Sequence, residues 1–144
     1  MRHFFYGTLL DPDVRNRVLG LAARAEGRPA RLDGYRRVHA PGKGYPVVIP
    51  GSGSVAGLLF DGVTPRQRLR IAAFEGTGYR KVLMTVTVVD GQALTAWAFL
   101  PLRPPQFAAE WSLQRWRKFE KVRLLRLLDA RGPAVRARSS RSAG

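Results

Sequence analysis

Residues 79–100 read YRKVLMTVTVVDGQALTAWAFL and contain two strand-like segments on either side of a turn signal. In the first segment apolar side chains alternate with other side chains, which is the period of a half-buried strand. The apolar members of this alternation are Val82, Met84, Val86 and Val88. Asp90-Gly91 is typical of a tight hairpin turn, and residues 94–100 form the predicted return strand, with Trp97 and Phe99 on one face. The sequence therefore predicts an antiparallel hairpin.

Two helices are predicted from their start and stop signals. Thr64-Pro65-Arg66-Gln67 combines a threonine cap, a proline in the first turn and a glutamine three residues after the cap. This helix ends at Gly76, just before the hairpin. Asp11-Pro12-Asp13 predicts a shorter helix near the N-terminus, because aspartate caps a helix and proline fits its first turn. Gly20 closes it.

The rest of the N-terminal two thirds is strand-like. A short β-prone run over residues 2–6 ends at Gly7. One or two strands are expected over residues 22–38, with Asp33-Gly34 as a turn or bulge. Further along, we expect a short strand at 45–49, a turn at 50–54 and an apolar strand at 55–60.

The C-terminal part is predicted to be one helix followed by a tail. After a proline-rich linker, apolar residues with threefold spacing indicate a helix over residues 112–128 that packs on the sheet. They are Leu113, Trp116, Phe119, Val122, Leu125 and Leu128. Residues 131–144 carry few apolar side chains and are predicted to be a disordered basic tail. Together these features predict a single, mostly antiparallel α+β domain over residues 1–130 that encloses a pocket.

Composition narrows the classes of function. The 144 residues contain no cysteine and two histidines, so disulfides and thiolate or histidine-rich metal sites are not expected. No run of about 18 apolar residues and no signal peptide is present, so we expect a cytoplasmic protein without a membrane span. The net charge of +15 argues against a strongly cationic substrate. It attracts anions and nucleic acid without specifying either.

Glu75 is the central candidate for chemistry. It follows the apolar residues 71–74 at the end of the second predicted helix. Apolar surroundings and the negative end of a helix both raise the pKa of a carboxyl group. A glutamate tuned in this way can accept a proton and return it. From its position alone, an ordinary polar residue at a helix end is the alternative interpretation.

The turn Tyr6-Gly7-Thr8-Leu9 is the second candidate. Glycine allows a ligand to approach the backbone closely, and successive N–H groups can hold a carboxylate or an oxyanion. A plain connection between a strand and a loop is the alternative. Tyr79 and Arg80, directly before the hairpin strand, would wall a pocket and pair with an acid group, or they would be a core aromatic and a surface cation.

These segments resemble the signatures of one known family. Tyr6-Gly7-Thr8-Leu9, after an N-terminal strand, resembles the Tyr-Gly-Ser/Thr-Leu signature of the gamma-glutamylcyclotransferase-like proteins. Phe74-Glu75-Gly76, followed by Tyr79-Arg80 and an alternating strand, resembles the second signature of that family. Residues 45–48 and 55–60 are similar to its middle portion, so that the resemblance covers about residues 2 to 100.

The resemblance implies a fold and a reaction. The fold would be α+β, a small mixed, mostly antiparallel β-barrel with flanking helices and a central cavity. Glu75 would be the general acid/base, and the substrate-binding residues would be Tyr6, Gly7, Thr8, Leu9, Tyr79 and Arg80. The enzyme would release 5-oxoproline from a small γ-glutamyl compound by attack of the substrate's own amine. That attack is intramolecular, so no metal or cofactor is expected.

Two other functions are kept as alternatives. The same cavity would serve a binding module that holds a small anionic amino-acid derivative without reacting. Association with nucleic acid through the basic surface ranks last, because the sequence has no aromatic-plus-basic recognition motif. The sequence predicts neither the leaving amine nor the oligomeric state.

Overall fold

The computed structural model describes residues 1–20, 27–40, 43–105 and 108–135. Its elements in chain order are β1 (His3–Phe5), the 3-10 turn η1 (Thr8–Leu10), α1 (Pro12–Leu19), β2 (Arg28–His39), β3 (Pro46–Phe60), α2 (Pro65–Glu75), β4 (Tyr79–Val88), β5 (Ala93–Pro101), α3 (Leu113–Phe119) and α4 (Lys121–Arg131). The strands close into a barrel in the order β1-β3-β2-β4-β5. β1 runs parallel to β5, and the other pairs are antiparallel. The predicted α+β class and mixed, mostly antiparallel barrel are confirmed; the central cavity stays a prediction.

The predicted hairpin forms strands β4 and β5. Tyr79 pairs with Pro101 at one end and Thr87 with Ala93 at the other. Gly91 adopts a φ of 89°, in the left-handed region that favours glycine. The apolar alternation also holds, because Val82, Met84, Val86 and Val88 all pack into one cluster.

The short strand β1 divides two hydrophobic cores. Phe4 and Tyr6 pack into a cluster with residues from all five strands, which places this cluster inside the barrel. Phe5, which points to the other face, joins the cluster under the helices. This division follows from the alternation of side chains along a strand. Residue 6, just beyond β1, is therefore anchored in the barrel, and the next residues turn outward to the helices.

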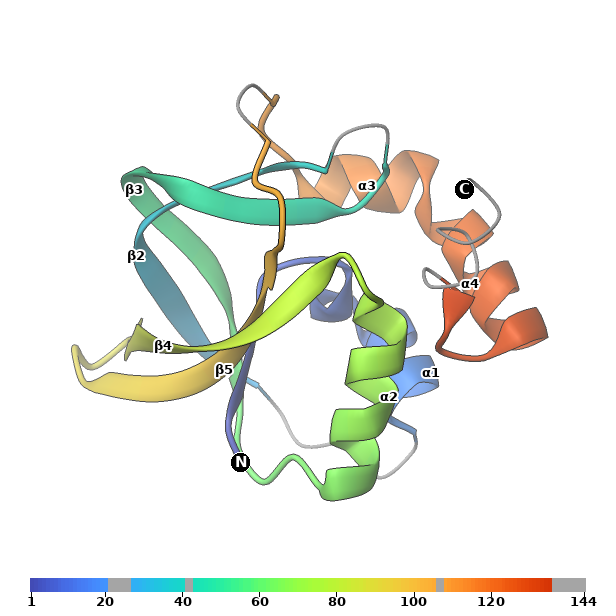
Figure 1. Cartoon of the computed structure of the whole chain (residues 1–144), viewed down its shortest axis with the longest axis horizontal. Coiled ribbons are helices and arrows are strands. Elements are labelled where there is room, and N and C mark those ends of the chain that lie inside the picture. The colour runs from blue at the N-terminus through green and yellow to red at the C-terminus, as the bar shows by residue number, and fades with distance from the viewer. Residues whose placement is uncertain (21–26, 41–42, 106–107, 136–144) are drawn as a thin grey trace.

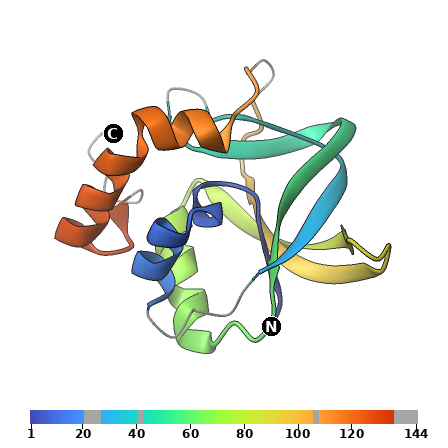
Figure 2. The ribbon, with the colours of Figure 1, turned by 180° about the vertical axis from the view of Figure 1, so that it is seen from behind.

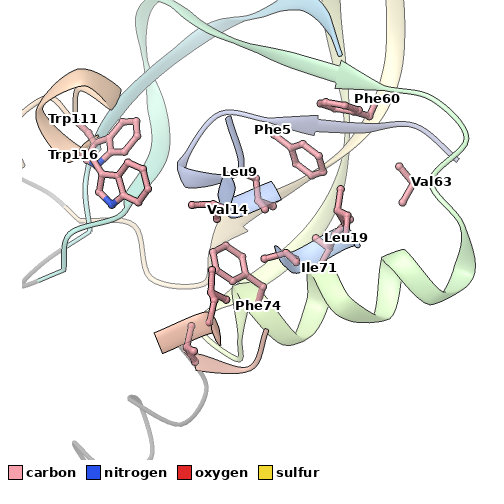
Figure 3. Packing of buried hydrophobic residues seen from close by; sticks show 13 residues of the cluster. Phe5, Leu9, Val14, Leu19, Phe60, Val63, Ile71, Phe74, Trp111 and Trp116 are labelled. Carbon is pink, nitrogen blue, oxygen red and sulfur yellow. The ribbon is translucent and has the colours of Figure 1, made fainter. Parts of the chain in front are cut away.

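Helices α1, α2 and α4 cover one side of the barrel, with α1 between the other two (Figures 1 and 2). Both predicted caps are present. The Asp11 carboxylate accepts from the backbone N–H groups of Asp13 and Val14, and Thr64 and Gln67 form a reciprocal capping box. In Figure 3, Phe74 of α2 points toward Val14 of α1, in the cluster that joins these helices to β1.

The prediction of a turn at residues 50–54 is wrong, because β3 continues through these residues as one strand of 15 residues. Asp33 pairs with Ser54, whereas Tyr35 pairs with Pro50, so three residues of β3 lie opposite Gly34 alone. This irregularity is a bulge, which bends and twists a strand. The glycines and Pro50 therefore mark a bend of the barrel wall, and the bulge predicted at Asp33-Gly34 is confirmed.

The chain over residues 112–128 is divided at Glu120 into α3 and α4. Glu120 has φ −122° and ψ −25°, outside the helical range. Because the chain changes direction here, part of the predicted apolar stripe faces solvent. Phe119 is 64% exposed and Val122 is 60% exposed. Of the predicted tail, Arg131 is the last residue of α4 and Val135 is buried in the core. Residues 21–26 and 136–144 lie outside the described residues. In the described part, no helix has the length and apolar character needed to cross a membrane.

Candidate active site

The turn after β1 is packed tightly against β3. The Tyr6 hydroxyl donates a hydrogen bond to the Phe99 carbonyl of β5, which fixes the start of the turn in the barrel. At Gly7, a Cβ would lie 3.0 Å from Cγ of Pro46 and 3.3 Å from its Cδ. A side chain at this position would therefore require Pro46 to shift by a few tenths of an ångström. The Gly7 carbonyl then accepts from Leu10 N at 2.9 Å and closes η1.

Two arginines bind the carbonyl oxygens of this turn. Nη1 of Arg37, on β2, donates to the Tyr6 carbonyl at 3.0 Å and to the Ala56 carbonyl at 3.3 Å. Its guanidinium lies 5.2 Å from the ring centre of Trp111, and burial lowers its pKa below the usual range. Arg15 of α1 donates to the carbonyls of Leu9 and Leu10. These contacts hold the peptide planes of the turn in one orientation.

Glu75 is the last residue of α2 and is half-buried. Its position is fixed by its own helix, because Ile71 and Phe74 are wholly buried in the core that α2 shares with α1. Gly76 ends the helix with a φ of 80° and donates its N–H to the Ala72 carbonyl. Arg70 also binds the Arg17 carbonyl of α1 at 3.0 Å. The side chain of Glu75 is therefore attached to a helix end that is held in place.

Glu75 and the turn line the same small pocket of about 20 Å³. This is room for about one water molecule. The lining residues are Phe4, Phe5, Tyr6, Gly7, Thr8, Leu9, Pro46, Glu75 and Phe99. Most of the lining side chains are apolar, and Glu75 lines the pocket together with the backbone turn from Tyr6 to Leu9. A carboxyl group that lines a pocket can accept a proton from a bound ligand and return it.

The remaining two predicted site residues lie outside this lining. The Tyr79 hydroxyl donates to the Pro46 carbonyl at 3.3 Å, and its ring lies 6.2 Å from that of Tyr45. Tyr79 therefore touches the pocket through Pro46. Arg80 is exposed on β4 and is not one of the residues that line the pocket.

Sequence reasoning missed Phe99, Pro46 and Arg37. Phe99 reaches the pocket from the return strand because the barrel closes β5 onto β1. Arg37 was hidden among many arginines, and no local pattern distinguishes it. Pro46 belongs to the segment that carried the family resemblance, which was the only signal for it. All three are brought to the turn by strand pairing, which the sequence alone does not specify.

Asp11 connects the turn with the C-terminal helices. Its carboxylate is wholly buried and binds Nε of Arg117 at 2.8 Å and Nζ of Lys121 at 3.0 Å. Burial alone would raise the pKa of Asp11, but the hydrogen bonds from Arg117 and Lys121 outweigh it and hold the pKa below its usual value. Residues far apart in the chain thus meet directly beside η1.

Within the described residues, no three His, Asp or Glu side chains are grouped in a way that would hold a metal ion.

Comparison with known proteins supports one family. Residues 3–118 match the family described as gamma-glutamyl cyclotransferase, AIG2-like. The chain therefore belongs to this family, which includes gamma-glutamyl cyclotransferases. The chain is 28% identical to AIG2-like protein A of Arabidopsis thaliana over 126 residues. This alignment covers 85% of the chain and 75% of that protein.

Solved structures agree with this assignment. The solution structure of an Arabidopsis thaliana protein aligns with this one at a TM-score of 0.65 and 27% sequence identity. The alignment covers 87% of this chain and 85% of that one. A protein titled gamma-glutamyl cyclotransferase aligns over 84% of this chain and 98% of its own, with a TM-score of 0.57 and 13% identity. The second likeness shows a shared fold.

Proposed function

We propose that this protein is a cyclotransferase that releases 5-oxoproline from a γ-glutamyl compound, with Glu75 as the general acid/base. One observation carries the proposal: Glu75 and the turn from Tyr6 to Leu9 line the same pocket, although they lie far apart in the sequence. Membership in the family supports it independently. The turn would hold the amino-acid end of the glutamyl group.

The reaction would proceed by intramolecular aminolysis. Glu75 removes a proton from the α-ammonium of the substrate, and the freed amine attacks the γ-carbonyl carbon. A carbon–nitrogen bond forms, closing a five-membered ring, and the bond from that carbon to the leaving amine breaks. The protons lost by the attacking nitrogen end on the leaving nitrogen, so that no water is consumed. Positioning of the two reacting groups in one molecule contributes about 7–11 kcal/mol.

The backbone of the turn would stabilise the oxyanion of the tetrahedral intermediate. Arg37 supports this role indirectly, because it holds the Tyr6 carbonyl and with it the plane of the Tyr6–Gly7 peptide. Tyr79 would act as a positioning residue through the Pro46 carbonyl. Arg80, exposed and away from the pocket lining, would have no direct role.

Substrate entry requires the pocket to open. A cavity of about 20 Å³ does not hold a glutamyl group. Side-chain rearrangement on binding is common at ligand sites. The side chains at the mouth, rather than the rigid end of α2, would provide this movement.

The test is incubation of the protein with a panel of γ-glutamyl compounds, namely a γ-glutamyl peptide, a γ-glutamyl amine and an ε-linked γ-glutamyl lysine. We expect 5-oxoproline and the free amine in equal amounts from at least one member, measured by mass spectrometry. Tight binding without any product would contradict the proposal and would indicate a non-catalytic binding module. The absence of both product and binding would contradict both functions.

A further inference from the structure

Helix α3 lies at the end of the molecule opposite the N-terminus (Figures 1 and 2), and an open groove of about 910 Å³ lies beside it. The lining of this groove comes from the end of β2, from residues 43–44 and 108–112, and from α3 and the beginning of α4. Among the described residues, none lines both this space and the pocket of Glu75. We call the space the α3 groove. It is a feature that the proposed reaction does not use.

Hydrogen bonds hold the walls of the α3 groove in place. The backbone N–H of His39 donates to the Ala109 carbonyl at 2.9 Å. The backbone N–H of Trp111 donates to the Arg37 carbonyl at 3.2 Å, and its Nε1 donates to the Gly44 carbonyl at 2.9 Å. The segment before α3 is therefore paired with β2 and with the chain before β3. The groove is thus built into the fold.

The cations of α3 and α4 form two groups. In the first, Arg117 and Lys121 bind the buried carboxylate of Asp11 and hold the helices to α1. The cations of the second group are exposed, and within the described part of the chain they make no salt bridge within 4.0 Å. They are Arg115, Lys118, Arg123, Arg126 and Arg131. Their charges are therefore available to a partner outside this chain.

The charged lining of the α3 groove is positive on balance. It consists of three cations and two carboxylates, namely Lys43, Arg115, Arg123, Glu110 and Glu120. Lys118 adds a fourth cation beside the groove, because its ammonium lies 5.4 Å from the ring centre of Phe119, which is part of the lining. Cations spread along a groove attract an extended polyanion, whereas one small anion would neutralise only some of them.

Phe119 places an aromatic ring among these cations. Its side chain is 64% exposed and belongs to none of the three hydrophobic clusters of the described residues. The Arg115 guanidinium lies 5.7 Å from the ring centre, in addition to the contact with Lys118. Packing of the core therefore does not explain this ring. Proteins that bind single-stranded nucleic acid combine such a ring, on which a base stacks, with cations that contact the phosphates.

We propose that the α3 groove binds a single strand of RNA or DNA without sequence preference. A base stacks on Phe119, and the neighbouring phosphates contact Arg115, Lys118 and Arg123. The sequence contains no standard motif for this interaction, because the surface is assembled from segments that lie far apart in the chain. This function is separate from the proposed cyclotransferase reaction, since the two sites have no lining residue in common among those described.

An anionic lipid bilayer is a less suitable partner for this surface. A bilayer is flat and does not enter a groove. Phe119 and Val122 are the only large apolar side chains of α3 and α4 that are exposed. A helix that lies on a bilayer instead buries a broad apolar face in it. The observations therefore favour a flexible strand.

The test measures binding of the whole protein to a fluorescein-labelled oligothymidine of about 20 nucleotides, by fluorescence anisotropy at several salt concentrations. Replacing two lining cations together, Arg115→Gln with Arg123→Gln, should weaken binding at least about tenfold. It should also reduce the slope of log K against log salt by about 1.4, because each phosphate contact contributes about 0.7. The matched control, Arg36→Gln with Arg66→Gln, removes the same charge at exposed positions outside the groove and should weaken binding less than about threefold.

A second variant tests the stacked base. Phe119→Ala should weaken binding about five- to a hundredfold. Leu69→Ala, at a 74% exposed apolar residue of α2, should leave the affinity unchanged. A duplex of the same length should bind more weakly than the single strand, because its bases are already stacked on one another. Circular dichroism checks the folding of each variant.

Four results would overturn the proposal. They are the absence of binding at low salt, equal losses in the two double variants, wild-type affinity in Phe119→Ala, and equal affinity for strand and duplex. Binding to phosphatidylserine vesicles but not to the strand would identify a lipid surface as the partner and would overturn the proposal as well. None of these results bears on 5-oxoproline formation, so the cyclotransferase function is tested separately.

Discussion

His3 is buried in β1 at 1% exposure, stacked against Phe99, and has no hydrogen-bond partner among the described residues. Burial, followed by the charges of Lys81, the N-terminus and Arg68, lowers the pKa of His3 to about 4. In the unfolded chain the imidazole titrates near pH 6.5. Between these two values the unfolded state binds a proton that the folded state does not, so stability falls as the solution is acidified.

From this difference we predict that the free energy of unfolding decreases by up to about 3 kcal/mol between pH 6.5 and pH 4 because of His3. His3→Phe should flatten this dependence, which urea denaturation at several pH values will measure. His39→Gln provides a matched control, since His39 is half-buried on β2 and belongs to neither of the two hydrophobic clusters that β1 divides. An unchanged slope in His3→Phe would show that other groups cause the acid sensitivity.

At the scale of elements, the turn after β1 depends on β2 through Arg37. The side chain of Arg37 contributes hydrogen bonds to two carbonyls and a contact with the Trp111 ring. Methionine keeps the apolar stem and removes the donors. We predict that Arg37→Met lowers the stability by about 1–3 kcal/mol and lowers kcat/KM further than this loss of folded protein explains. Thermal denaturation and kinetics on an accepted substrate will measure the two effects.

Arg36→Met is the control for this substitution, because Arg36 is the exposed neighbour on the same strand. Arg37→Lys should recover part of the activity, since lysine donates to carbonyls but lacks the planar guanidinium. Wild-type kinetics in Arg37→Met would contradict a positioning role for Arg37.

The elements with strong local signals were predictable from the sequence. The β4–β5 hairpin follows from alternation and Asp90-Gly91, and α1 and α2 follow from their caps. In the site, Glu75 and the turn singled out by the motifs line one pocket, and their roles stay predictions. The course of β3 and the break at Glu120 were not predictable, because they depend on how the barrel wall bends and on what the helices pack against.

At the scale of the whole molecule, Asp11 joins the first turn to the last two helices. Asn at this position keeps the capping oxygen and removes the charge that binds Arg117 and Lys121. Breaking a buried ion pair costs about 3–5 kcal/mol, but both cations here are partly exposed. We therefore predict that Asp11→Asn lowers the free energy of unfolding by about 1–3 kcal/mol, as measured by denaturant titration.

Asp13→Asn removes a more exposed partner of Lys121 and should cost about 0.5 kcal/mol or less. An equal loss of unfolding free energy in Asp11→Asn and Asp13→Asn would contradict the role of Asp11 as the buried link to the C-terminal helices. The net charge of +15, in contrast, indicates attraction of anions in general and does not identify the site.

The proton-transfer role of Glu75 is tested most directly by the turnover of Glu75→Gln on a γ-glutamyl substrate that the wild type accepts. Glutamine keeps the shape of the side chain but does not exchange a proton, so we predict that 5-oxoproline formation falls by about 10²–10⁴-fold. Glu110→Gln, at an exposed glutamate outside the pocket lining, should retain wild-type turnover. Wild-type turnover by Glu75→Gln, with unaltered folding, would contradict the assignment of this carboxylate as the group that moves the proton.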